Sequence, residues 1–237
     1  GVDLVVPHHE DEIAQSEAAT GEPFVGTWLH NAHLQMRGVK MAKSAGNFAR
    51  PADLYEAGLS PRALRYALMA THYRSPLEFS QHTLDSAAAA VERINNAVIA
   101  LEAYREERPD DETLPQLLAR ARAAFAAGLD DDLNISEALA ATFDLVRELN
   151  SRVAARSLST ADAQRGAGAI RELDRVLGVL DEAAGDELDP ELMAMLDARV
   201  EARAARDWAR SDDLRDALAA SGVVVEDTPD GQRWRRA

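Results

Sequence analysis

The sequence contains no cysteine among its 237 residues, so disulfides and thiolate chemistry are excluded from this chain. It also has no run of 18 apolar residues, and it therefore predicts no membrane span. The first residues lack the charged and apolar regions of a secretory signal. Together these absences favour a cytoplasmic protein that does not contact a membrane.

Aromatic residues make up only 5% of the chain, whereas Ala and Leu are abundant. This balance favours helices, because Ala and Leu lose little free energy in forming them. From periodicity and start signals we expect helices over 8–19, 51–58, 61–72, 81–105, 114–127, 136–156, 160–183, 190–206 and 208–220. Ser136 is the predicted N-cap of the helix over 136–156. A strand or hairpin arm over 28–37, a loop over 38–48 and a C-terminal hairpin turning at 229–231 complete the prediction.

The net charge of −15 is unevenly distributed along the chain. Residues 1–80 carry 7 Lys and Arg against 9 Asp and Glu, and residues 198–237 carry 8 of each kind. Residues 81–197 carry 11 basic against 24 acidic side chains. The middle of the chain is thus a poor partner for a polyanion, whereas the arginines at either end could contact a nucleic acid.

The stretch VVPHHEDEIAQSEA, residues 5–18, places two histidines among several acids. His8 and Glu12 are four residues apart, which puts both on one face of a helix, as two ligands of one metal ion require. His9 either orients such a ligand or lies at the surface, and the sequence leaves both readings open.

The stretch KMAKSAGN, residues 40–47, is a polar segment between glycines. Lys40 and Lys43 are three residues apart, and a mobile loop would let both reach phosphate oxygens. A solvated turn with two lysines explains the same pattern when it is taken alone.

Several stretches in the same order resemble cysteinyl-tRNA synthetases. GVDLVVPHHEDEIAQSE is similar to a family stretch around its histidines, and KMAKS resembles the KMSKS signature of class I aminoacyl-tRNA synthetases, with Ala42 where Ser is usual. Further similar stretches are WLHN, THYRSPLEFS (71–80), LDDDLNISEAL (129–139) and RAARDWARSDDLRDALAASGVVVEDTPDGQRWRR (203–236). Their shared order is more specific than any single motif.

This resemblance implies a mainly α fold with α/β parts. Residues 1–80 would form the C-terminal part of a class I, Rossmann-type catalytic domain, with the KMSKS-like loop and helices that contact the tRNA stem. Residues 81–184 would form a DALR-type helical bundle, and residues 190–237 a small α/β anticodon-binding domain.

The implied activity is the ATP-dependent ligation of L-cysteine to tRNA-Cys through a cysteinyl-adenylate. The resemblance makes His8 and Glu12 two of four zinc ligands, the other two being cysteines upstream of the matched stretch. Lys40 and Lys43 would be catalytic, stabilising charge on the phosphates of ATP bound with Mg²⁺, which Lys43 would also bind.

Further site residues follow from the resemblance. Asp3 would lie at the bound nucleotide, although a loop-capping role explains it equally well. Trp28 would lie at the substrate pocket, or else be a half-buried core residue. Arg203, Trp208, Asp212 and Asp227 would bind anticodon bases, because Arg and Trp stack on unpaired bases and Asp accepts from their amino groups. A core anchor is the alternative for Trp208.

Three adjacent acids, Asp130, Asp131 and Asp132, could be mistaken for a metal site. We expect them instead to cap the helix that begins near Ser136.

The sequence has neither the HIGH signature of class I synthetases nor an initiator Met. We therefore expect a portion of the enzyme that is inactive alone, with the remaining segment supplied on the same or a separate chain. A cysteine ligase of mycothiol synthesis is one alternative, and residues 190–237 argue against it. A non-catalytic tRNA-binding fragment is the other.

Overall fold

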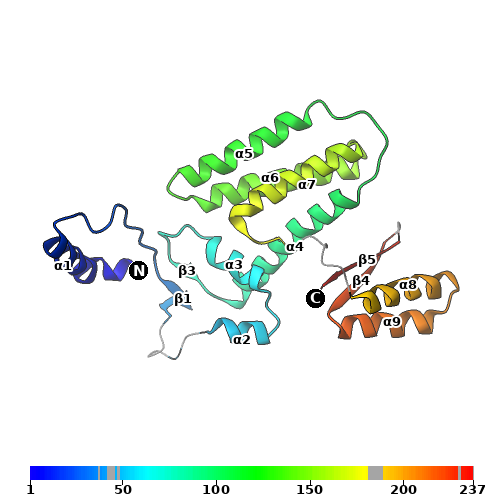
Figure 1. The fold of residues 1–237 in the computed structure, drawn as a ribbon, viewed down its shortest axis with the longest axis horizontal. Helices are drawn as coiled ribbons and strands as arrows, with labels where there is room; N and C mark the ends of the chain where they lie inside the picture. The colour runs from blue at the N-terminus through cyan, green and yellow to red at the C-terminus, as the bar shows by residue number, and fades with distance from the viewer. Residues whose placement is uncertain (37, 42–45, 47–48, 181–188, 229–230, 237) are drawn as a thin grey trace. The chain divides into compact units, whose positions relative to one another are not determined.

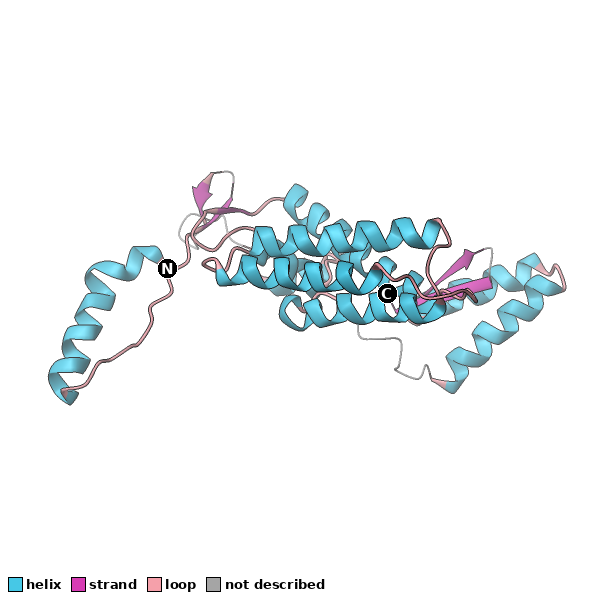
Figure 2. Cartoon of the chain, turned by 90° about the horizontal axis from the view of Figure 1, so that it is seen from above, coloured by secondary structure: helices cyan, strands magenta, loops and turns pink. Residues whose placement is uncertain are grey.

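The computed structural model describes the chain except residues 37, 42–45, 47–48, 181–188, 229–230 and 237. The chain divides into two compact units, residues 1–180 and 181–237, each described by itself below. Helices dominate both, with short strands in each (Figure 2), so the expectation of a mainly α chain with α/β parts is confirmed. Within the described residues, no helix has both the length and the apolar character needed to cross a membrane.

The first unit opens with helical turns that bury no side chain. A 3₁₀ turn (η1, Val2–Leu4) and a π-helical turn (η2, Val5–His9) lead into α1, Glu10–Thr20. Gly21 ends α1 in the left-handed conformation with φ of 72°, which glycine adopts without steric cost. The predicted helix over 8–19 is therefore confirmed, although no residue of α1 is buried.

A small three-stranded sheet follows, with strand order β2-β1-β3; Figure 1 labels two of its strands, β1 and β3. β1 (Leu34–Met36) pairs antiparallel with β2 (Val39–Lys40) and parallel with β3 (Leu77–Glu78). The predicted strand over 28–37 was too long, because only residues 34–36 find ladder partners in the described chain. The predicted loop over 38–48 lies partly outside the described residues, and in its described part Val39 and Lys40 form β2 rather than loop.

Six helices complete this unit. They are α2 (Pro51–Glu56), α3 (Pro61–Met69), α4 (Gln81–Ala103), α5 (Leu114–Asp130), α6 (Ile135–Ala154) and α7 (Thr160–Leu177). The last four form a bundle whose core is made of aliphatic side chains, among them Leu101, Leu114, Leu149 and Ile170, all at most 1% exposed. Leu and Ala recur at helical spacing on the inward faces, which is why these segments pack as a bundle.

Several helix ends differ from the prediction by a few residues, among them the end of α3 at Met69 and that of α5 at Asp130, and two differences have a visible cause. Asn134, rather than Ser136, caps α6, and its side-chain oxygen accepts from the Glu137 amide at 3.4 Å. α7 ends at Leu177, short of residue 183, because Gly178 turns left-handed with φ of 63°. The predicted residues 181–183 lie outside the described chain.

Two arginines of α3 bond to the backbone at the end of α7. The Arg65 guanidinium donates to the carbonyl of Leu177, and that of Arg62 donates to the carbonyl of Leu180. Carbonyls at a helix C-terminus lack partners within the helix, and cations there are favoured by the helix dipole. These contacts attach α3 to the bundle.

The second unit contains α8 (Pro190–Ala204), α9 (Trp208–Ala220) and an antiparallel pair, β4 (Val223–Thr228) and β5 (Gly231–Arg236). Leu196, Leu218 and Val223 form its small buried core. The predicted helices and hairpin are confirmed, and the two residues at the tip of the turn lie outside the described chain.

Candidate functional site

His8 and Glu12 lie side by side at the start of α1. The His8 Nε2 atom is 3.4 Å from Glu12 Oε1, and both side chains are about half exposed, at 59% and 46%. One imidazole and one carboxylate on a single exposed face fit two donors of a metal ion, but zinc sites take three or four protein ligands. Within the described residues, no group of three or more His, Cys, Asp and Glu side chains could hold a metal.

A stack of rings lies beside this pair. The imidazole of His9 stacks on the Trp28 indole with centroids 4.9 Å apart, and Trp28 lies parallel to His30 at 5.8 Å. His9 Nδ1 and His30 Nε2 share a hydrogen bond of 2.8 Å. His9 is therefore bonded to a second histidine, not a lone surface residue. His30 was not predicted, although it lies in the WLHN stretch that contains Trp28.

Two of the predicted nucleotide-site residues meet at the edge of the small sheet. Lys40 Nζ at the end of β2 lies 2.7 Å from Asp3 Oδ2, and the His33 ring is 4.0 Å from the other oxygen. The hydrogen bond from Lys40 lowers the pKa of Asp3 below its usual value. Lys43, and the departure from the family pattern at Ala42, lie outside the described residues.

In the second unit, three of the four predicted anticodon residues form one connected array. Asp227 bonds to Arg203 at 3.1 Å, and the Arg203 guanidinium lies 5.7 Å from the centre of the Trp208 ring. Asp212 instead pairs with Arg215 at 3.2 Å within α9. Trp208 is 56% exposed and so is not the core anchor considered as its alternative.

Arg199 is a member of this array that the sequence analysis missed. It is 1% exposed and holds both carboxylate oxygens of Asp227 at 3.0 Å. The sequence offered one signal for it: Arg199 follows Leu196 by three residues and so shares the apolar face of α8. Burying a charge there costs free energy unless the charge is paired, which points to an acidic partner.

Asp132 does not cap α6. The three acids separate, since Asp130 ends α5 and Asp131 is its C-cap. The carboxylate of Asp132 accepts from the Tyr73 hydroxyl at 2.6 Å and from two nitrogens of Arg74 at 2.6 and 3.0 Å. These bonds connect the turn between α5 and α6 to the segment that precedes β3. The backbone of Asp132 lies in the left-handed region, with φ of 52°.

The Asp132 contact predicts a defined acid dependence of stability. Hydrogen bonds from Arg74, and then Tyr73, lower the pKa of Asp132 from 3.8 to about 2. A folded-state pKa below the unfolded one adds stability above the unfolded value, which is lost as pH falls through the folded value. The Tm difference between the wild type and Asp132→Asn should therefore stay constant above about pH 5 and shrink between about pH 4 and 2.

Asn is a suitable replacement because it tolerates positive φ, so the backbone of the turn is kept. Thermal unfolding of both proteins over this pH range measures the difference. A Tm difference that persists unchanged to pH 2 would contradict the assignment.

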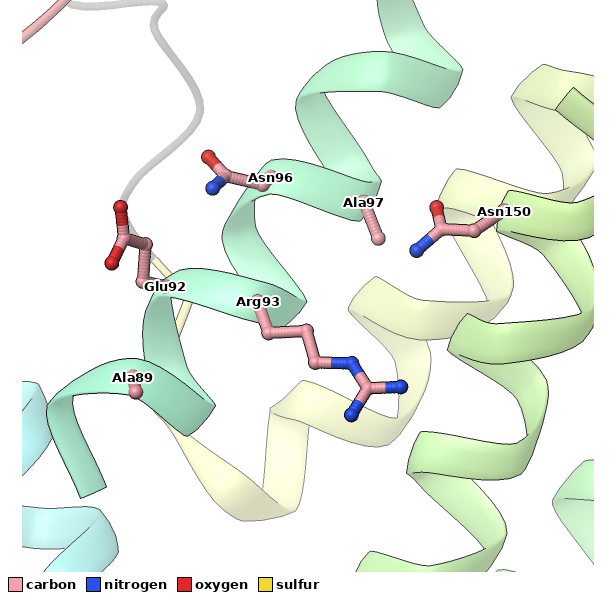
Figure 3. A pocket seen from close by; sticks show the side chains of 6 residues that line it. All are labelled: Ala89, Glu92, Arg93, Asn96, Ala97 and Asn150. Carbon is pink, nitrogen blue, oxygen red and sulfur yellow. The ribbon is translucent and has the colours of Figure 1, made fainter. Parts of the chain in front are cut away.

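A separate hollow lies on the bundle between α4 and α6 and is lined by Ala89, Glu92, Arg93, Asn96, Ala97 and Asn150 (Figure 3). Its volume is about 350 Å³, and most of its polar side chains come from α4. The Arg93 guanidinium lies 5.4 Å from the centre of the Phe143 ring. None of the predicted site residues lines this hollow.

Three family descriptions match the chain in order. Residues 1–89 match the tRNA synthetases class I (C) catalytic domain, residues 124–181 the DALR domain, and residues 185–235 the Cysteinyl-tRNA ligase anticodon binding domain. The matches follow in the order that the resemblance implied, and the catalytic match extends to residue 89.

Curated relatives match along the whole chain. They include cysteine--tRNA ligases of Symbiobacterium thermophilum, at 46% identity, and of Brevibacillus brevis and Leptospira interrogans, both at 42%. Each alignment covers 100% of this chain but only 51–52% of the relative. The chain therefore spans about half the length of the curated relatives it matches.

A solved structure supports the fold alone. The LeuRS-tRNA-LeuAMS ternary complex of Agrobacterium radiobacter K84 is similar with a TM-score of 0.56 over 76% of this chain and 25% of that one, at 20% identity. The ordered family matches and the identity of 40–46% to cysteine--tRNA ligases agree with the motifs quoted above. The chain belongs to the cysteinyl-tRNA synthetase family, within the class I aminoacyl-tRNA synthetases.

Proposed function

We propose that this chain is part of an enzyme that ligates L-cysteine to tRNA-Cys with ATP, through a cysteinyl-adenylate. The observation that carries the proposal is the ordered match of catalytic, DALR and anticodon-binding regions along one chain. Because the chain spans about half of its relatives, it would perform only some of the steps alone.

The proposed regions have separate tasks. Residues 1–80 would contribute to the catalytic domain and the tRNA stem contact, residues 81–184 would form the DALR bundle, and residues 190–237 would bind the anticodon. The acidic middle region would contact little phosphate. Since translation takes place in the cytoplasm, we infer that the enzyme acts there.

In the activation step, charge develops on the phosphates of ATP as the cysteine carboxylate attacks the α-phosphate and pyrophosphate leaves. Lys40 and Lys43 are the proposed cations for this charge, with Mg²⁺ accompanying ATP. The position of Lys40 beside Asp3 supports a nucleotide site at this sheet edge, because the resemblance assigns both residues to it from separate stretches of the sequence.

The proposed zinc centre would use His8 and Glu12 with two further ligands that this chain does not contain, since it has no cysteine. Bound zinc would hold the thiol of the substrate cysteine. A thiol is a soft ligand that binds zinc better than the hydroxyl of serine does. Shape alone separates cysteine from serine poorly. Trp28 would contribute to the walls of the same pocket through its stack on His9.

The match of residues 185–235 to an anticodon-binding domain favours a tRNA ligase over the cysteine ligase of mycothiol synthesis, which has no anticodon to bind. A non-catalytic tRNA-binding fragment is tested by the experiment that follows.

The test compares tRNA-Cys with a non-cognate tRNA in filter binding to the 237-residue chain, at several salt concentrations. We expect tighter binding of tRNA-Cys, and affinities that fall with salt because phosphate contacts release counterions. Equal affinity for the two tRNAs would contradict anticodon binding. In parallel, ATP–pyrophosphate exchange should remain at background for this chain and appear only for the complete enzyme, whereas exchange by this chain alone would show that it is catalytically sufficient.

A further inference from the structure

Arg199 is the largest side chain among the fully buried residues of the described chain. Its Nη1 and Nη2 atoms each lie 3.0 Å from one carboxylate oxygen of Asp227, which makes the pair bidentate. A buried guanidinium costs free energy unless its charge is paired and its donors are bonded. Asp227 pairs the charge through both terminal nitrogens, whereas the buried Nε atom of Arg199 has no hydrogen-bond partner among the described residues.

Gln232 fixes the guanidinium from a second side. Its Oε1 accepts from Arg199 Nη1 at 2.9 Å, and its Nε2 donates to the Leu196 carbonyl at 2.7 Å. Gln232 also pairs with Asp227 across β4 and β5. Arg199 is therefore held by side chains of both strands, and Gln232 is in turn anchored to α8, so the orientation of the guanidinium is fixed.

The other end of this array faces solvent. Asp227 is 41% exposed although its partner Arg199 is buried, and Arg203 approaches it at 3.1 Å. Trp208, 56% exposed, lies 5.7 Å from the Arg203 guanidinium. An acceptor, a cation and an aromatic face are thus presented together, which is the set of groups that binds unpaired bases.

The hydrogen bond from Arg199 is also the main reason that the pKa of Asp227 is lowered. An ionised carboxylate only accepts hydrogen bonds. It therefore favours base edges that carry N–H donors and disfavours edges that carry only oxygen or nitrogen acceptors.

We propose that Arg199 is a positioning residue for RNA recognition, which fixes the Asp227 carboxylate so that it accepts from the N–H edge of an unpaired base near Trp208. The inference rests on the proposed binding of tRNA by this unit and assigns a residue beyond the four carried by the family resemblance.

The experiment measures a ratio: the affinity for tRNA-Cys divided by the affinity for the same tRNA with one anticodon base changed. The 237-residue chain is titrated with tRNA-Cys and with the same tRNA carrying a single base change at each anticodon position in turn. For the wild type we expect at least one change to weaken binding about tenfold, the effect typical of one lost base contact. With Arg199→Met this ratio should fall below about twofold, because Asp227 then loses its bidentate partner and keeps only the more exposed Arg203.

Three further variants control for folding and charge. Arg199→Lys keeps the charge without the fork and should also lose most of the ratio, and Gln232→Leu should lose part of it. Arg210→Met, in the same unit, removes a charge of equal size from an exposed residue of α9. It should change both affinities together and leave the ratio intact. Thermal unfolding of each variant reports whether the unit stays folded.

The outcomes separate the two levels of the proposal. A wild type that binds all tRNAs equally overturns the proposed function. A wild type that discriminates, with Arg199→Lys or Arg199→Met still discriminating as well, overturns only the role of Arg199. If Arg199→Met fails to fold, the folded Arg199→Lys and Gln232→Leu variants decide the question by the same ratio.

Discussion

Replacing Asp162 by Ala is expected to lower the free energy of unfolding of the helical bundle by about 3 kcal/mol. This is the upper part of the cost of leaving a buried hydrogen-bond donor without its acceptor. Asp162 is fully buried at the start of α7. Its carboxylate accepts from the backbone amides of Asp111 at 2.8 Å and Ser159 at 3.2 Å, and from Arg165 at 2.8 Å. The substitution removes all three contacts and leaves the two amides without this acceptor.

The contact with Asp111 also explains why the effect should extend beyond one helix. It joins the segment before α5 to the first turn of α7, 51 residues further along the chain. Loss of the carboxylate therefore loosens two elements at once. Urea unfolding followed by far-UV circular dichroism measures the change, since the bundle contributes most of the helix.

Asp144→Ala is the matched control. Asp144 lies on the exposed face of α6, where its partner among the described residues is Arg147, three residues away. Exposed ion pairs contribute little to stability, so this variant should unfold at the same urea concentration as the wild type. A loss below about 1 kcal/mol for Asp162→Ala would mean that the amides find other partners, and would contradict the assigned role.

Lys43→Ala in the complete enzyme is expected to reduce ATP–pyrophosphate exchange by about 10²–10³-fold, the cost of removing one group that stabilises transition-state charge. The loss should appear mainly in kcat, because the charge on the phosphates grows as the transition state forms. Lys43→Arg should recover part of the rate, since it restores the positive charge without the same reach.

Lys40→Ala should produce a smaller loss than Lys43→Ala. The Lys40 ammonium already lies 2.7 Å from Asp3, whose carboxylate offsets part of its charge. Arg147→Ala, an exposed charge change in the bundle, should leave exchange unaffected. A fall of less than about threefold for Lys43→Ala, when the expected effect is two orders of magnitude, would remove this lysine from the activation step.

Much of the helical fold was predictable because its signals are local. Ser60 and Pro61 mark the start of α3, and Ser80 begins α4 with a side chain that accepts from the Thr83 amide. The strand over 28–37 was less predictable, because a strand exists only where a partner pairs with it. β3 is more than 40 residues away from β1 in the sequence, and no local pattern announces that pairing.

The candidate site divides in the same way. His8 and Glu12 could be placed on one face from spacing alone, and the structure puts them 3.4 Å apart. Arg199 could not be found from the sequence, because its role depends on Asp227 arriving from a strand 28 residues later. Asp132 was misassigned for a related reason: proximity to a helix start suggested a cap, whereas its partners come from the segment before β3.

The attachment of α3 to the end of α7 has a consequence for the order of folding. The bonds from Arg62 and Arg65 join residues separated by 118 and 112 positions. Closing loops of that length is entropically unfavourable until the intervening helices have collapsed, whereas the α5–α6 hairpin needs only neighbouring residues. We therefore expect these bonds to form after the transition state for folding. Such bonds slow the unfolding rate of the protein and leave its refolding rate nearly unchanged.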